Sequence, residues 1–252
     1  MPFAGTQGRL ALPGAVFSHY RHQNQQKAPQ ERAVDPKVDI VVNGKKSAAD
    51  APFPASLEAT LGPGMFAAAF SEISSWPGYR QTPLRHLTSL AGELGLADIA
   101  YKDEADRFGL GSFKALGGAY AVLRCLERAL RDAGITDPVT AADLTAGRHR
   151  EIVSTITVTS ATDGNHGRSV AWGARLFGCR AVIFVHAHVS EGRCKAIEAY
   201  GAEVNRVRGN YDDSVRHAFE VAAREGWFVI QDTATADYRD IPADITCGYG
   251  VI

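Results

Sequence analysis

Cysteine is scarce in this sequence, and the few cysteines present form no cluster typical of a redox or metal site. The four cysteines make no CxxC pair and no zinc-finger spacing with histidine: Cys125, Cys179, Cys194 and Cys247. Cys125 and Cys179 lie in apolar segments, where a reduced thiol packs as a small hydrophobic group. The pattern therefore predicts a reducing compartment and no disulfide framework.

An excess of charge is also missing, as are long hydrophobic runs. The chain has 252 residues, of which 27 are Lys or Arg and 28 are Asp or Glu, so its formal net charge is −1. This balance gives no electrostatic footprint for nucleic acid or for an anionic membrane. No stretch approaches the length of a membrane span, and the first residues lack the basic and apolar regions of a signal peptide. We therefore expect a cytoplasmic protein with a small-molecule ligand and no nucleic-acid or membrane partner.

Several nucleotide and hydrolase motifs are absent as well. The sequence contains no GxGxxG that opens a helix after a strand, no GxxxxGK[ST] and no GxSxG. These absences weigh against a Rossmann dehydrogenase, a P-loop nucleotidase and an α/β-hydrolase. His186 and His188 alternate on one strand face, as metal ligands do, but no third ligand accompanies them. We expect no metal site.

A regular alternation of strands and helices is present in the second half of the chain. β-Branched and apolar runs predict strands at residues 152–160, 180–187, 202–208 and 227–232. Amphipathic runs between them predict helices at residues 165–178, 190–201 and 211–226. This order indicates βαβ units, and therefore an α/β fold with a parallel sheet and right-handed crossovers.

The first half is less regular. Residues 1–60 are poorly patterned, although residues 38–44 read as a short edge strand. Leu84, Leu87, Leu90 and Leu94 lie at helical spacing between Pro83 and Gly95, which predicts an amphipathic helix there. A longer helical pattern follows at residues 115–134, and residues 241–252 resemble the opening of another helix.

Lys114 stands between a glycine-broken turn and the helical pattern, directly after Phe113. If Ser112 caps that helix, Lys114 lies in its first turn, near the positive end of the helix dipole. That position and an apolar surround both favour the neutral amine, which is the form that Schiff-base chemistry needs. Taken alone, the residue is better interpreted as an exposed lysine in a first turn, because lysine is rarely buried.

Polar residues also follow two of the predicted strands. Residues 162–166 lie where a strand passes into a helix, and such helix N-termini bind anions at the carboxyl ends of strands in open α/β sheets. Asp163 is unexpected in an anion-binding loop because it repels the ligand, and a helix N-cap is the alternative role for it. Asp232 follows a strand of the same sheet, where turn chemistry is the alternative.

Four segments carry a resemblance to a known family. They occur in the order found in fold-type II pyridoxal-phosphate enzymes of the tryptophan synthase β group: PGYRQTPLRHL, YKDEADRFGLGSFKALGGAY, TSATDGNHGRSVAWGA and GAEVNRVRGNYDDSVRHA. Within that group the sequence resembles the diaminopropionate ammonia-lyases over residues 76–250. The resemblance implies pyridoxal 5′-phosphate as the cofactor and a homodimer as the assembly of the complete enzyme.

The resemblance also implies a fold-type II architecture. It is expected to comprise a small parallel three-layer αβα domain and an incomplete large domain. The implied boundaries follow the N-terminal segment of residues 1–60: residues 61–116 begin the large cofactor-binding domain, residues 117–235 form the small domain, and residues 236–252 return to the large one.

The same resemblance assigns cofactor-binding roles to three residues. Lys114 matches the lysine that binds the aldehyde carbon of pyridoxal phosphate, and Phe113 matches the aromatic residue that packs against the cofactor. Asn165 matches the asparagine that hydrogen-bonds the pyridine 3-hydroxyl oxygen.

Substrate binding and proton transfer are assigned in the same way. The loop that holds the substrate carboxylate matches Thr162, Asp163, Gly164 and His166. Asp163 resembles the aspartate implicated as base for the Cα proton of the D-isomer, and Lys114 is placed to serve the face of the L-isomer. Asp232 matches a second acidic residue of that active site.

The reaction implied is β-elimination of ammonia from 2,3-diaminopropionate, which gives pyruvate and ammonia. One alternative is a threonine or serine dehydratase of the same fold, against which Asp163 argues. Another is a truncated, non-catalytic remnant. A flavodoxin-like binding domain fits the alternating strands and helices but leaves Lys114 and the Asp163 loop without a role.

Two parts of the family pattern are not found in the 252 residues. The glycine-rich loop that binds the cofactor phosphate is one, and the Ser, Thr or Cys that faces the pyridine nitrogen is the other. We therefore expect the chain to be a fragment that binds pyridoxal phosphate weakly or not at all. The measurement is titration of the purified chain with the cofactor, followed at roughly 410–420 nm, where lysine-bound pyridoxal absorbs. A strong band at that wavelength would contradict the expectation.

Overall fold

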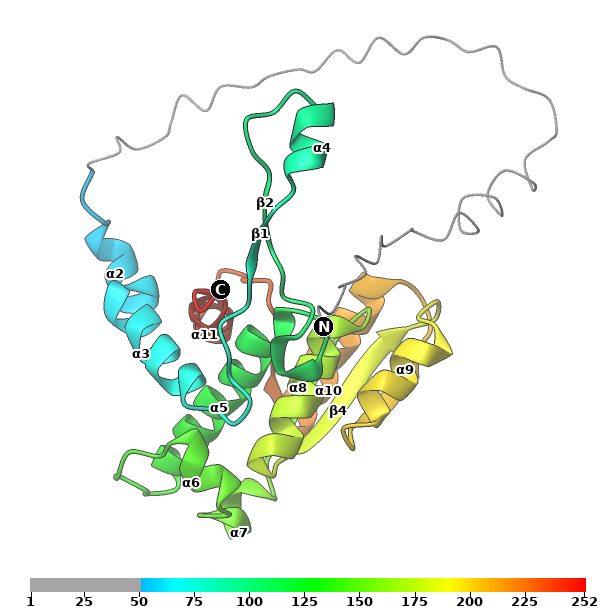
Figure 1. The fold of residues 1–252 in the computed structure, drawn as a ribbon. Helices are drawn as coiled ribbons and strands as arrows, with labels where there is room; N and C mark the ends of the chain where they lie inside the picture. Colours follow the sequence, from blue (N-terminus) through cyan, green and yellow to red (C-terminus); the bar gives the residue numbers. More distant parts are fainter. Residues whose placement is uncertain (1–50) are drawn as a thin grey trace, which may run out of the picture. The chain divides into compact units, whose positions relative to one another are not determined.

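A parallel four-stranded sheet forms the centre of the computed structural model, which describes residues 51–252 (Figure 1). The strands lie in the order β5-β4-β3-β6, and their bounds are β3 Thr157–Ala161, β4 Arg180–His186, β5 Glu203–Val207 and β6 Phe228–Val229. This confirms the predicted parallel sheet. The edge strand expected at residues 38–44 lies outside the described residues.

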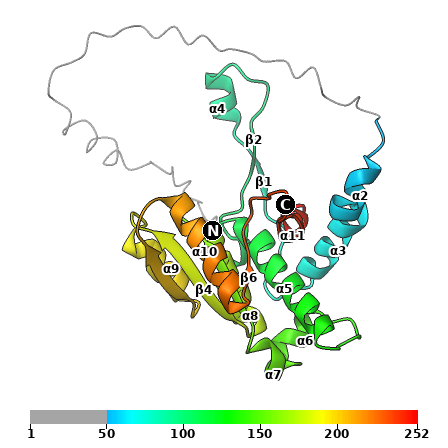
Figure 2. The same ribbon diagram turned by 180° about the vertical axis from the view of Figure 1, so that it is seen from behind.

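Helices cover both faces of this sheet, and the central strands β3 and β4 are accordingly buried on both faces. Along β4, Val182 and Phe184 pack with Ala218 and Val221 of α10, whereas Ile183 belongs to the larger core on the opposite face. Figures 1 and 2 show α10 on one face and the helices α8 and α9 on the other. The bounds are α8 Asn165–Phe177, α9 Glu191–Glu198 and α10 Tyr211–Glu225. The expected three-layer αβα arrangement is therefore confirmed.

The chain reverses its direction of winding at β3. It passes outward from β3 to β4 and β5, and then returns to place β6 on the other side of β3. In open α/β sheets such a switch point leaves a crevice at the carboxyl ends of the two strands. The residues that follow β3 and β6, at 162–164 and 230–232, lie at this position.

A long buried helix, α5 (Lys114–Asp132), packs against α8 and against the last helix, α11 (Asp240–Tyr249). Small residues allow close approach of the helices: a Cβ atom at Gly173 of α8 would lie 2.8 Å from the Cα atom of Ala119 in α5. A Cβ atom at Gly118 would in turn collide with the hydroxyl group of Ser169. This contact sets the position of α5, and hence of Lys114 at its first turn, relative to the start of α8.

The remaining elements are shorter. They are α2 Ala55–Leu61, α3 Pro63–Ser74, β1 Leu84–His86, α4 Thr88–Glu93, β2 Ala100–Lys102, the 3-10 turn η1 Arg107–Gly109, α6 Ala141–Thr145 and α7 Arg150–Val153. Within residues 51–252 no helix is long and apolar enough to cross a membrane. Residues 52–252 form one compact unit, and the predicted boundaries at residues 61–116, 117–235 and 236–252 remain predictions.

The helix predicted from Pro83 to Gly95 is only partly present. Leu84 instead begins β1, which pairs antiparallel with β2 so that Leu84 lies opposite Lys102, and α4 starts at Thr88. The leucine spacing does not mark a buried face, because Leu84, Leu90 and Leu94 are all exposed. The hairpin of β1, α4 and β2 extends away from the other helices (Figure 1). Strand pairing therefore overrides helical periodicity in this segment.

The contact between α5 and α8 leads to a prediction about stability. We expect Gly173→Ala to lower the free energy of unfolding by about 1–3 kcal/mol, because its new methyl group overlaps the backbone of Ala119. Gly192→Ala is the matched control, since Gly192 lies in α9 and its added Cβ would meet nothing within 4 Å. The control should stabilise the chain by about 0.4–1 kcal/mol. Urea unfolding followed by circular dichroism measures both, and equal effects of the two substitutions would contradict the packing argument.

Candidate functional site

A pocket of about 320 Å³ opens at the switch point of the sheet. It lies where the ends of β3 and β6 meet the first turns of α5, α8 and α10, and it is lined by Lys114, Ala161, Thr162, Asp163, Gly164, Asn165, His166, Arg193, Tyr211 and Asp232. Of the eight residues singled out from the sequence, seven line this pocket. Phe113 is the eighth and lies beside it.

Lys114 and Asp232 are joined across the pocket although 118 residues separate them in the chain. The Nζ atom of Lys114 donates a hydrogen bond to Oδ2 of Asp232 over 2.5 Å. The rings of Phe113 and Tyr249 lie nearby, with their centroids 5.8 and 5.5 Å from Nζ. The surroundings expected for Lys114 were apolar. In the structure they are mixed, because the aromatic rings flank an amine whose charge is balanced by a carboxylate.

The start of α5 differs slightly from expectation. Ser112 does not occupy the N-cap position, which belongs to Phe113, but its hydroxyl oxygen accepts the backbone N–H of Lys114 over 3.2 Å. Lys114 is thus the first residue of the helix, as predicted. The ring of Phe113 packs edge-on against Tyr249 at a centroid distance of 5.0 Å.

His166 is buried in the wall of the pocket with one ring nitrogen unpaired. Its Nε2 lies 2.8 Å from the carbonyl oxygen of Ile230, which only accepts, so Nε2 carries the proton. Nδ1 then has a free lone pair; it is buried without a hydrogen-bond partner, 3.7 Å from Oδ2 of Asp232. Burial lowers the pKa of His166 and outweighs the nearby carboxylate of Asp232, which acts in the opposite direction.

Asp232 is held in its charged form by its neighbours. Partial burial by itself raises the pKa of a carboxyl group. At the low pH where Asp232 titrates, the charge of protonated His166, together with the hydrogen bond and the charge of Lys114, outweighs burial and keeps the pKa of Asp232 below its usual value. The site therefore contains an ammonium–carboxylate pair beside a neutral imidazole.

The loop between β3 and α8 presents free backbone donors to the pocket. The hydroxyl oxygen of Thr162 accepts the N–H groups of Gly164 and Gly167, each over 3.0 Å. Among the described residues, the N–H groups of Asn165 and His166 find no acceptor, so they remain available at the positive end of α8. Gly164 has φ +155°, a conformation that favours glycine.

The alternative role considered for Asp163, a helix cap, is wrong. Gly164 occupies the N-cap position of α8, and the hydroxyl oxygen of Thr162 accepts the N–H of Gly167 in the first turn of the helix. The side chain of Asp163 instead lies beside His186, with Oδ1 2.9 Å from Nε2. His186 and His188 come within 5.9 Å of each other, measured between ring centroids. Among residues 51–252 no group of three or more His, Cys, Asp or Glu side chains has the geometry of a metal site.

Sequence reasoning missed three residues of the pocket, Ala161 and the two polar residues Arg193 and Tyr211. Arg193 lies in the first turn of α9, and its guanidinium group donates to the backbone oxygen of Asp163 over 3.3 Å. Tyr211 begins α10, and its hydroxyl group accepts a hydrogen bond from the side chain of Gln231 over 2.6 Å. Both residues start helices that follow strands of the same sheet, and this position was the available signal.

The lowered pKa of His166 makes the free energy of unfolding depend on pH. The unfolded chain protonates this residue near its ordinary pKa of about 6.5, whereas the native chain does so only at lower pH because burial lowers the pKa. The unfolded state then binds more protons, so the free energy of unfolding should decrease as the pH falls below about 6.5.

Urea unfolding between about pH 7 and about pH 5, a range around the ordinary histidine pKa, measures this effect. We expect His166→Gln to remove part of the decrease, and the exposed His188→Gln to leave the decrease unchanged. A decrease that is identical in all three proteins would contradict the assignment to His166.

Comparison with known proteins relates this site to characterised enzymes. Diaminopropionate ammonia-lyase from Salmonella typhimurium is 42% identical over 173 residues, which cover 69% of this chain and 42% of the relative. The structure of the Escherichia coli ammonia-lyase in complex with D-serine matches with a TM-score of 0.69 and 38% identity, over 76% of this chain and 48% of that one. The same enzyme with an aminoacrylate–pyridoxal-phosphate intermediate matches with a TM-score of 0.65 and 36% identity, over 76% and 47%.

The chain therefore spans less than half the length of these relatives. A family described as pyridoxal-phosphate dependent enzyme matches residues 75–252, which include every residue of the pocket. The chain belongs to the family of pyridoxal-phosphate dependent enzymes.

Proposed function

We propose that residues 75–252 serve the elimination of ammonia from 2,3-diaminopropionate. The observation that carries this proposal is the presence of two carboxylates, Asp163 and Asp232, in one pocket with Lys114. A diamino acid carries two ammonium groups, so carboxylates in the pocket offset its additional positive charge. The similarity to relatives named diaminopropionate ammonia-lyase supports the same substrate.

The residues of the pocket fit pyridoxal phosphate. Lys114 supplies the amine for its aldehyde carbon, and Asn165 stands beside it at the first position of α8. The free N–H groups at the start of α8 supply donors for an amino-acid carboxylate, and the buried, unpaired Nδ1 of His166 is an acceptor for a donor group of the ligand. Phe113 offers an aromatic face next to the lysine.

When bound, pyridoxal phosphate supplies an electron sink that makes the Cα proton of an attached amino acid removable. The protein groups must then place bases on the required face of that carbon. Lys114 leaves Asp232 and gives its ammonium proton to water, so that its neutral amine acts as the base on one face, and Asp163 acts as the base on the other. The first turn of α8 orients the substrate carboxylate so that the Cα–H bond faces one of these bases.

The overall conversion consumes one water molecule and gives pyruvate and two molecules of ammonia. One ammonia leaves from Cβ after the Cα proton has been removed. The resulting three-carbon enamine hydrolyses to pyruvate and releases the second ammonia. Asp232, which is charged and next to Lys114, keeps a counter-charge in the pocket during the exchange of amines.

We also propose that the complete enzyme is a cytoplasmic homodimer, which the family resemblance supports. The dehydratase alternative and the non-catalytic alternative predict different products. A dehydratase forms 2-oxoacids from serine or threonine in preference to the diamino acid. A non-catalytic remnant forms none from either.

The test measures pyruvate formation from D- and L-2,3-diaminopropionate and 2-oxoacid formation from serine and threonine. It uses the chain itself with added pyridoxal phosphate, and a chimera in which residues 75–252 replace the matching part of the E. coli ammonia-lyase. We expect the chimera to prefer the diamino acid. No preference for it would contradict the proposed substrate.

Lys114→Ala in the chimera is the control for the site. Because Lys114 is proposed both to bind the cofactor and to move a proton, we expect activity to fall by on the order of a thousandfold. Arg124→Ala lies outside the pocket and should retain most of the activity, provided that both variants fold as judged by circular dichroism.

A further inference from the structure

His186 is the last residue of β4, and it lies next to Asp163, which lines the pocket. Its side chain is largely covered, with 18% exposed, whereas the side chain of Asp163 is 61% exposed. An aspartate so open to solvent has freedom to change its rotamer unless a neighbour restrains it. The contact between His186 Nε2 and Asp163 Oδ1, at 2.9 Å, provides that restraint.

The orientation of the imidazole is set from its other nitrogen. The backbone N–H of His188 donates to Nδ1 of His186 over 3.1 Å. In the neutral ring, Nδ1 must then be the acceptor, so the proton is on Nε2, the nitrogen that lies 2.9 Å from Oδ1 of Asp163. The histidine therefore presents a donor to the carboxylate without having to be charged.

The turn that supplies the N–H of His188 is itself tied down. Arg206 of β5 donates to the backbone oxygens of Ala187 and Val189 over 3.1 and 2.7 Å, and it also pairs with Glu191 at 2.5 Å. These bonds fix the backbone at the end of β4. Through His188 and His186, these bonds connect Asp163 to β5, a second strand that does not line the pocket.

We propose that His186 is a positioning residue for Asp163: it donates Nε2–H to Oδ1 and holds the carboxylate against the pocket as a proton acceptor. The proposal rests on the proposed function, in which Asp163 is the base for one face of Cα. His186 touches no atom that reacts, and its effect passes through Asp163. Lys114 and Asp232 do not depend on this contact, because they pair with each other on the other side of the pocket.

The first experiment needs no activity. Histidine labelled with ¹⁵N in the 252-residue chain reports which ring nitrogen is protonated, and His186→Ala identifies the signals of His186. We expect a protonated Nε2 and an unprotonated Nδ1 near pH 8. Asp163→Asn should shift the Nε2 signal, because a neutral amide is a weaker acceptor than a carboxylate. Protonation at Nδ1, or signals unaffected by Asp163→Asn, would overturn the proposal.

The second experiment compares substrate isomers in the chimera. We expect His186→Ala to lower kcat about ten- to a hundredfold for the isomer served by Asp163, as the misplacement of a catalytic group does, and to change the other by less than about twofold. His186→Gln offers an N–H donor at a similar reach and should recover part of the loss. Equal losses on both isomers, or no loss on either, would overturn the positioning role.

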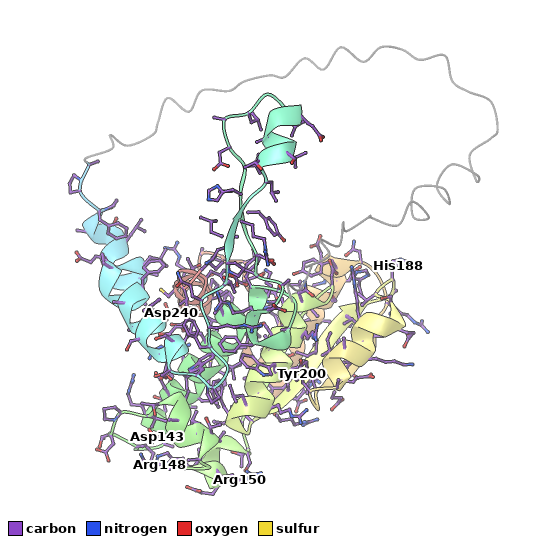
Figure 3. All side chains as sticks on the ribbon, in the orientation of Figure 1. Asp143, Arg148, Arg150, His188, Tyr200 and Asp240 are labelled. Carbon is purple, nitrogen blue, oxygen red and sulfur yellow. The ribbon has the colours of Figure 1, made fainter. Side chains whose placement is uncertain are left out.

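His188→Ala is the matched control. The ring of His188 is exposed at the periphery of the molecule (Figure 3), and the substitution keeps the backbone N–H that bonds His186. It should alter neither the nitrogen signals of His186 nor the ratio of the two isomers. If neither isomer is converted by the unsubstituted chimera, the proposed function fails, while the nitrogen signals still decide whether His186 holds Asp163.

Discussion

The close contact between α5 and α8 is the constraint on which the site depends. Lys114 begins one helix and Asn165 begins the other, so the distance between the helices sets the distance between the amine and the anion-binding turn. Gly173 lies against Ala119 where any side chain would collide. Two buried helices can hold their first turns in register only if they cannot slide, and tight packing of small residues prevents sliding. The chemistry of the pocket is therefore a consequence of core packing.

The sheet adds the remaining groups through its topology. Because β6 returns to the other side of β3, Asp232 is brought to Lys114 from 118 residues away. The same return places Ile230, whose carbonyl oxygen fixes the tautomer of His166. The switch point thus determines both the charge partner of the lysine and the protonation of the histidine. Neither the charge partner of the lysine nor the protonation of the histidine is determined by residues close to it in the sequence.

This explains which features were predictable from the sequence. Strand and helix alternation is a local property, so the parallel sheet and the position of residues 162–166 at the end of a strand were predicted correctly. The ion pair of Lys114 with Asp232 is not local, and the sequence around Lys114 suggested apolar surroundings instead. The hydrogen bonds considered for Asp163 as a cap are made by Thr162 instead, since its hydroxyl, two residues before the N-cap Gly164, reaches two N–H groups. Leu84 was assigned to a helix because its spacing matched, yet strand pairing with Lys102 decides its structure.

The two carboxylates of the pocket differ in what they can do because they have different partners. Asp232 is bound to an ammonium group and is kept charged by it, so its lone pairs are engaged until Lys114 moves. Asp163 is open to solvent, and its neighbour is His186, whose Nε2 lies 2.9 Å from Oδ1 and for which we propose a neutral, donating ring. A carboxylate in that situation still has free lone pairs and meets little desolvation, so it accepts a proton without first breaking an ion pair. The division of labour that we propose for the two aspartates, one as counter-ion and one as base, therefore rests on their side-chain partners, and it does not require them to differ in any intrinsic property.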